Sequence, residues 1–154
     1  MKYRIYLDTC CLNRPFDDQT QLRIRLETEA ILRILEICKT NTWLLISSQV
    51  IEAEISQIAD TERRRRVALA ASSAVESIRL DESIKSRAEY LEGLGFAAFD
   101  ALHLASAELT GVDILLTTDD RFVRLFLRSR NRIQIAVENP LRWITEKGET
   151  PDAN

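Results

Sequence analysis

The chain has 154 residues, of which 24 are Asp or Glu and 21 are Lys or Arg, so its formal charge is −3. Its hydrophobic content of 45%, with only four Gly and three Pro, excludes a disordered chain and a loop-rich scaffold. A chain of roughly 150 residues buries most of its unfolded surface, which suits one domain with a single core. The mildly acidic balance also argues against a protein that coats nucleic acid.

The sequence indicates a reduced, cytoplasmic protein. No stretch approaches the ~18 consecutive apolar residues of a membrane helix. The first apolar run contains Arg4 and Asp8, which is not the pattern of a signal peptide. The three cysteines are an odd number, with Cys10 and Cys11 adjacent, and the chain has no CxxC pair and one His. These features argue against a disulfide framework and a structural zinc site.

Predicted strands and helices alternate along the chain. Short apolar runs rich in β-formers predict four strands, at residues 3–7, 43–46, 113–117 and 133–137. Apolar residues at helical spacing predict helices at residues 22–38, 48–58, 61–77, 82–94, 96–109, 120–128 and 140–144. Residues 13–18 carry loop signals. We therefore predict an α/β fold, a three-layer α/β/α domain with a central parallel sheet over residues 1–146, followed by a frayed tail over residues 147–154.

Two acids follow predicted strands. Asp8 comes directly after the first strand, and Asp119 comes shortly after the third. Ligands of open parallel sheets gather beyond the carboxyl ends of the strands, so the two acids could converge although they are far apart in sequence. Each acid alone is also explained as a turn former or helix cap, and Asp119 with Asp120 could simply cap the next helix.

Helix geometry separates two further acids on the predicted helix that Ser47 or Ser48 can cap. Glu54 lies within the apolar stripe of this helix, whereas Glu52 lies off its edge. The stripe is formed by Val50, Ile51, Ile55 and Ile58. Because a carboxylate on a buried face is costly unless it is paired or bound to a metal, Glu54 is the functional candidate and Glu52 faces solvent.

Asp100 lies in the first turn of an Ala-rich helix that is apolar nearly all round. The helix dipole alone could account for an acid there. It does not account for several such acids at one sheet edge. Four crowded carboxylates would repel each other and raise each other's pKa. A divalent cation such as Mg²⁺ or Mn²⁺ would remove this conflict and could promote the hydrolysis of a phosphodiester.

The order of these segments resembles PIN-domain ribonucleases, especially the VapC-like toxins of prokaryotic toxin–antitoxin pairs. Each matching motif is short, and together they cover nearly the whole chain in the family's order. The motifs are YLDT at residues 6–9, SSQVIEAEI at 47–55, FDALHLASA at 99–107, LLTTDDRF at 115–122 and Asn-Pro at 139–140.

This resemblance implies a PIN-like α/β/α fold and a Mg²⁺- or Mn²⁺-dependent endoribonuclease. It also implies an RNA substrate, a small antitoxin protein as partner, and a homodimer. By position, Asp8 and Asp100 would be the direct metal ligands, and Glu54 and Asp119 would complete the acidic pocket through water or a second metal. Thr117 matches the family's hydroxyl residue, which would orient the carboxylates.

Several residues near these motifs have more than one possible role. The fourth acid is Asp119 or Asp120, with Asp119 favoured by position, and Asn13 in the long polar segment 10–18 could also serve the pocket. His103 is either a ligand or proton carrier, or a hydrogen-bonded core residue. The arginines at 63–66 form either a solvated helical face or a contact with RNA or an acidic antitoxin. Those at 121, 124, 128, 130 and 132 could steer phosphate, and the cysteines are expected to be small core residues.

Two other functions are weighed against the nuclease. A non-catalytic PIN-like binding or scaffold module would have lost pocket acids, yet all four are present. An aspartyl phosphotransfer enzyme similar to the haloacid dehalogenases also places an Asp after its first strand. It would need a second acid two residues later, where this chain has Cys10.

Overall fold

A parallel sheet with β1 at its centre organises the molecule. The computed structural model describes residues 2–147. Within them, five strands form one parallel sheet in the order β3-β2-β1-β4-β5. The strands are β1 (Arg4–Leu7), β2 (Leu44–Ser48), β3 (Glu76–Ile78), β4 (Ile114–Leu116) and β5 (Ala136–Glu138). In the register, Ile5 of β1 lies opposite Leu45 of β2 and Ile114 of β4.

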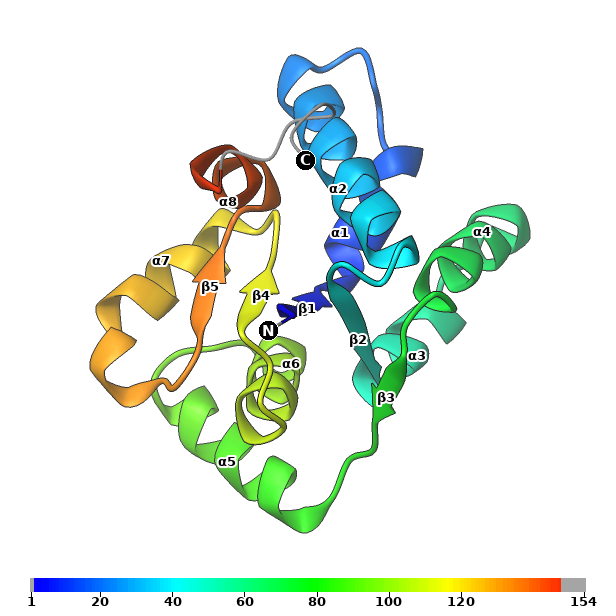
Figure 1. Ribbon diagram of the computed structural model, residues 1–154. Helices are drawn as coiled ribbons and strands as arrows, with labels where there is room; N and C mark the ends of the chain where they lie inside the picture. The colour runs from blue at the N-terminus through cyan, green and yellow to red at the C-terminus, as the bar shows by residue number, and fades with distance from the viewer. Residues whose placement is uncertain (1, 148–154) are drawn as a thin grey trace.

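Helices cover both faces of this sheet. In Figure 1, α2 and α8 pack together on one side of the strands, and α5 and α6 pack together on the other. The predicted three-layer α/β/α architecture is therefore confirmed. The helical elements are α1 (Thr9–Asn13), η1 (Arg14–Phe16), α2 (Leu22–Lys39), α3 (Gln49–Ser56), α4 (Thr61–Ala71), α5 (Glu82–Gly93), α6 (Ala98–Leu109), α7 (Asp120–Arg128), η2 (Arg130–Arg132) and α8 (Pro140–Glu146).

The core lies along the central strands. All three residues of β4 are buried, as are Ile5, Tyr6 and Leu7 of β1. Such continuous apolar runs are typical of parallel strands that are covered on both faces. The small side chains of Ala101 and Ala105 on α6 are fully buried. They let α6 lie close to the sheet, so that its first turn reaches the carboxyl edge of β1 and β4.

The helix predicted over residues 61–77 is wrong at its C-terminal end. Helix α4 ends at Ala71, where the hydroxyls of Ser72 and Ser73 donate hydrogen bonds to carbonyls of the last turn. The chain then forms β3, which pairs with β2. Two of the three residues of β3 are exposed, so no apolar run marks it as a strand. The sheet thus has five strands rather than the predicted four, and pairing with β2 overrides local preference.

The segment after β1 is helical, whereas the sequence predicted no helix there and a loop at 13–18. The carbonyl of Asp8 accepts hydrogen bonds from the amides of Cys11 and Leu12, which begins α1. Residues 14–16 then form the 3₁₀ turn η1. A five-residue helix is too short to produce a periodic apolar pattern, which is why sequence reasoning missed it.

Other predicted boundaries differ by a few residues. The strand predicted at 133–137 is instead Ala136–Glu138, because pairing with β4 begins at Ala136, opposite Ile114. Apart from Lys147, the predicted tail at 147–154 lies outside the described residues. Among the helices of the described part, none has the length and apolar character needed to cross a membrane.

Candidate active site

The candidate residues converge at the carboxyl edge of three neighbouring strands. Asp8 follows β1 directly, Thr117 follows β4 directly, and Glu54 lies on α3, which follows β2. Asp100 lies in the first turn of α6, and Asp119 is the N-cap of α7. Because β2, β1 and β4 are adjacent and parallel, their carboxyl ends bring these side chains to one place.

Asp8 is buried and held by Thr117. The hydroxyl of Thr117 donates a hydrogen bond of 2.8 Å to Asp8 Oδ2, and Thr117 Oγ1 also accepts a bond of 3.1 Å from the amide of Asp119. Thr117 therefore links the first acid to the turn that carries the last. Cys10 Sγ lies 3.3 Å from both Asp8 Oδ2 and Thr117 Oγ1. Cys10 is therefore a half-buried neighbour of the acids, whereas Cys11 and Cys38 are buried in the core as expected.

Glu54 and Glu52 point to different places. Glu54 is half-buried, and its Oε1 accepts a hydrogen bond of 2.6 Å from the hydroxyl of Thr9. Burial acts to raise the pKa of Glu54, but the hydrogen bond and charge of His103 and the hydrogen bond from Thr9 hold it below its ordinary value. Glu52 is exposed, and it accepts a hydrogen bond of 2.7 Å from Ser77 Oγ. The helix face distinguishes the two acids as the sequence predicted.

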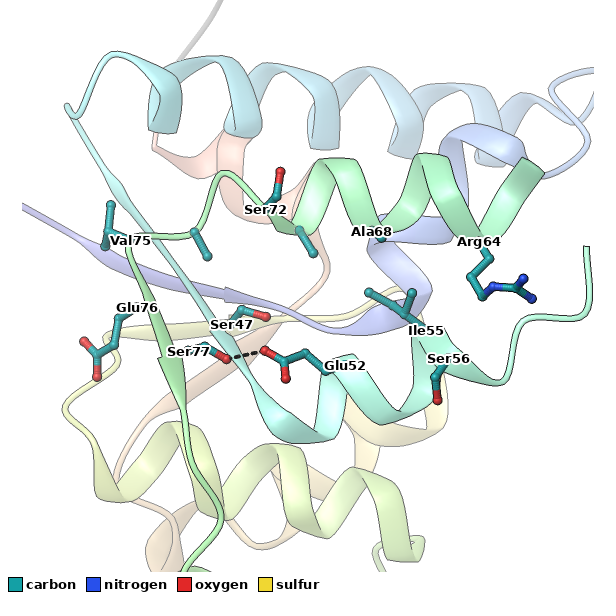
Figure 2. Close-up of a pocket in the computed structure, with 12 residues that line it drawn as sticks. Ser47, Glu52, Ile55, Ser56, Arg64, Ala68, Ser72, Val75, Glu76 and Ser77 are labelled. Carbon is teal, nitrogen blue, oxygen red and sulfur yellow. Dashed lines mark hydrogen bonds between the residues drawn. The ribbon is translucent and has the colours of Figure 1, made fainter. Parts of the chain in front are cut away.

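Glu52 lines a separate groove on the other side of α3. This groove of about 600 Å³ lies between α3, α4 and β3, and Figure 2 shows the Glu52 carboxylate beside Ser77 there. Ile55, Ala68 and Val75 contribute much of its apolar wall. Glu54 is not among the residues that line this groove, so α3 separates it from the acid cluster.

His103 is a buried, hydrogen-bonded residue that contacts two of the acids. Its side chain is fully buried, with Nε2 at 2.6 Å from Glu54 Oε1 and 3.4 Å from Asp8 Oδ1. Its Nδ1 lies 2.6 Å from Tyr6 Oη, which in turn lies 2.6 Å from Ser48 Oγ. Burial alone would lower the pKa of His103, but the charge of Asp8 and the contact with Glu54 raise it above its ordinary value.

The pKa of Asp100 shows that the acids influence each other. It is raised from 3.8 to about 7, first by burial and then by the charges of Asp8 and Asp119, with a smaller contribution from Glu54. The charge of His103 acts in the opposite direction. These causes place Asp100 within electrostatic reach of the other three acids.

Asp119 and Asp120 have different partners. Asp119 Oδ1 accepts hydrogen bonds from the amides of Arg121 and Phe122, so this acid is a helix cap as well as a neighbour of Asp100. Asp120 forms a two-point ion pair with Arg23, each contact 2.8 Å long, which lowers the pKa of Asp120. The structure thus places Asp119, rather than Asp120, among the candidate acids.

The arginines near the sheet edge fall into two groups. Those at 63–66 contact their own chain: Arg63 pairs with Asp17 at 3.1 Å, and Arg65 pairs with Glu62 at 2.7 Å. Arg63 also donates to Asn13 Oδ1, so the amide of Asn13 is engaged there. Across the described residues, no hydrogen bond or ion pair is found for four side chains of α7 and η2, namely Arg121, Arg124, Arg128 and Arg130.

Sequence reasoning missed several polar residues around the site. Ser48, Tyr6 and Thr9 extend the contacts of His103 and Glu54, and the only sequence signal was that polar groups lie in or beside buried strands. Glu27 of α2 is 1% exposed and accepts hydrogen bonds from Arg14, Arg23 and Asn139. This buried acid ties α2 to η1 and to the start of α8.

The donor set suits a hard divalent cation. One ligand atom each from Asp8, Glu54 and His103 lie within 4.8 Å of one another. The charges of Asp8, Asp119 and Glu54 contribute to the raised pKa of Asp100. A bound cation would relieve this repulsion between the acids. Carboxylate oxygens are the ligands that Mg²⁺ and Mn²⁺ prefer, so the residues present fit such an ion.

The protein is thus a parallel α/β/α domain that carries an acid cluster at the carboxyl edge of its central strands. The model of the PIN domain matches residues 5–126, and the chain belongs to this family. PIN domains are generally nucleases. The comparison with curated proteins gives no match.

The fold is also similar to a solved structure described as VapBC2 from Rickettsia felis bound to a DNA fragment from their promoter. The TM-score is 0.59 at 15% sequence identity, and the match covers 88% of this chain and 98% of that chain. At this identity the likeness concerns the fold.

Proposed function

We propose that the protein is a metal-dependent endoribonuclease that hydrolyses phosphodiester bonds of RNA. The observation that carries this proposal is the convergence of four acids, whose mutual repulsion helps to raise the pKa of Asp100 to about 7. A fold has no structural need for such repulsion. Clusters of groups with shifted pKa values are typical of functional sites, and membership of the PIN domain family favours nuclease chemistry.

In this proposal, Asp8 and Asp100 hold the metal, while Glu54 and Asp119 complete the acidic pocket through water or a second ion. Thr117 keeps the Asp8 carboxylate in place through its 2.8 Å hydrogen bond. When bound, Mg²⁺ or Mn²⁺ would supply an activated water and would stabilise the charge that develops on the phosphate. The residues themselves orient the ligand oxygens, because each is fixed to a strand end or a helix.

We further propose that the protein is the toxin of a toxin–antitoxin pair. The fold similarity to a VapBC2 structure and the order of the sequence motifs support a small antitoxin protein as partner. A homodimer and a cytoplasmic location belong to the same proposal.

Two measurements test these proposals. A monomer by light scattering at assay concentrations would contradict the homodimer. Growth that is unaffected when the protein is expressed without a partner would contradict the role of toxin.

Cleavage of a mixed RNA pool tests the enzymatic proposal. The wild-type protein is incubated with Mg²⁺, with Mn²⁺ and with EDTA, beside Asp8→Asn. We expect cutting in either metal, no cutting in EDTA, and no cutting by Asp8→Asn even though it folds, because the substitution keeps the shape of the side chain and removes its charge.

Equal cutting by wild type and Asp8→Asn would contradict this site. No cutting in any metal would favour the alternative of a non-catalytic binding or scaffold module. Calorimetric titration with Mg²⁺ would then establish whether the acid cluster binds metal at all.

A further inference from the structure

Four buried or half-buried side chains form a continuous chain of contacts beside the acids. It runs from Ser48, the N-cap of α3, through Tyr6 of β1 and His103 of α6 to Glu54 of α3. Each of its three contacts is 2.6 Å long. Tyr6, Ser48 and His103 are buried in the protein core. The proposed chemistry assigns no role to these three residues.

The partners of Glu54 establish which nitrogen of His103 carries a hydrogen. Glu54 Oε1 already accepts the hydroxyl hydrogen of Thr9, and a glutamate side chain is ordinarily ionised near neutral pH. An ionised carboxylate can only accept hydrogen bonds. The 2.6 Å contact between Nε2 and Glu54 therefore requires the hydrogen to be on Nε2. This holds for a neutral ring and for a protonated ring.

The hydrogen bonds of Ser48 and Tyr6, at the other end of these contacts, agree with a hydrogen on Nε2 of His103. Ser48 Oγ accepts a hydrogen bond from the amide of Ile51, which leaves its own hydrogen for Tyr6 Oη. The hydroxyl of Tyr6 can then donate to Nδ1 of a neutral His103. The hydroxyls of Ser48 and Tyr6 and both ring nitrogens of His103 are then hydrogen-bonded, as buried polar groups require.

We infer that His103 is a positioning residue that holds Glu54 through an Nε2–H hydrogen bond, and that it is not a metal ligand. A nitrogen that carries a hydrogen has no free electron pair for a cation, although Nε2 lies close to oxygens of both Asp8 and Glu54. Thr9 and His103 both donate to Oε1 of Glu54. In the described residues Oε2 has no hydrogen bond, which leaves it for a metal or its water. Tyr6 in turn fixes the ring of His103.

Nitrogen NMR of the wild-type protein tests this assignment directly. His103 is the one histidine of the chain, so a protein purified without a histidine tag gives a single imidazole. We expect Nε2 to carry a hydrogen without metal and to keep it when Mg²⁺ is added to saturation. A hydrogen on Nδ1 alone, or loss of the Nε2 hydrogen on adding Mg²⁺, would overturn the inference.

Kinetics of Tyr6→Phe provide a second test, which rests on the proposed function. We expect a fall in kcat of about tenfold with KM unchanged, because the ring that positions Glu54 loses its anchor. Tyr90→Phe is the matched control, since this exposed tyrosine lies beside Arg87 on α5, and its kcat should not change. An unchanged kcat in Tyr6→Phe would contradict the positioning role.

Substitutions of His103 separate donation from packing. His103→Gln keeps an N–H group that can reach Glu54, whereas His103→Leu keeps only the volume, so Gln should retain more activity than Leu. Equal losses would contradict the role as donor. If the wild type cuts no RNA, the proposed function fails, while the NMR result still decides the state of Nε2. If it cuts RNA and Nε2 carries no hydrogen, this inference alone fails.

Discussion

At the scale of a single residue, the raised pKa of Asp100 predicts how the stability of the folded protein depends on pH. Its pKa of about 7 lies above the ordinary 3.8, so between these values the folded protein holds a proton that the unfolded chain releases. Stability therefore falls as the pH rises through this window. Removing the charge should stabilise the metal-free protein at about pH 8 and have less effect at about pH 5.

Thermal unfolding of Asp100→Asn in EDTA measures this effect. After allowance for partial solvent exposure, we expect a gain of about 1 kcal/mol, or about 2–4 °C in Tm, at about pH 8. In the wild type, Mg²⁺ should raise Tm, and in Asp100→Asn it should do so less. A variant that is less stable than the wild type at about pH 8 would show that Asp100 is not under repulsion from the other acids.

At the scale of elements, Glu27 connects three parts of the fold around the site. It accepts hydrogen bonds from Arg14 of η1, Arg23 of α2 and Asn139, the N-cap of α8. Arg23 also donates to the carbonyl of Thr118, in the turn that carries Asp119. The buried acid therefore helps to hold the β4–α7 turn against α2.

Glu27→Ala should lower the free energy of unfolding by about 1–3 kcal/mol, because it removes a buried carboxylate that accepts hydrogen bonds from half-buried Arg14, from Arg23 and from Asn139. Arg65→Ala is the control, since it breaks an exposed ion pair with Glu62, and it should change stability by less than about 0.5 kcal/mol. Urea unfolding of the two variants checks this. Similar losses in both would mean that the Glu27 contacts contribute no more than a surface pair.

Sequence reasoning predicted elements well where the pattern was long or the geometry local. The helix face of α3 distinguished Glu54 from Glu52, because 100° per residue fixes where each side chain points. Sequence reasoning failed for β3 and α1, because both elements are too short to show periodicity. The strand β3 depends on pairing with β2, and α1 depends on hydrogen bonds to the carbonyl of Asp8. The contact of Tyr6 with His103 joins residues 97 positions apart, so local pattern gives no sign of it.

At the scale of the whole molecule, the strand order creates the site. β1 lies between β2 and β4, so the segments that follow these three strands meet at one edge, where α6 adds Asp100. Alternation of strands and helices predicted the parallel sheet and hence the convergence of acids, but it did not predict the order of the strands. The order decides which loops are neighbours, and it depends on pairings between segments far apart in sequence.

The central claim is that the acid cluster, and no other acidic surface, cuts RNA. The most direct test compares single-turnover cleavage by Glu54→Gln and Glu52→Gln in Mg²⁺, because the two acids lie on one helix and differ in which side they face. We predict that Glu54→Gln slows cleavage by about a hundredfold or more, the contribution of a well-placed acid or base, while Glu52→Gln cleaves at the wild-type rate. Equal rates for the two variants would contradict the claim.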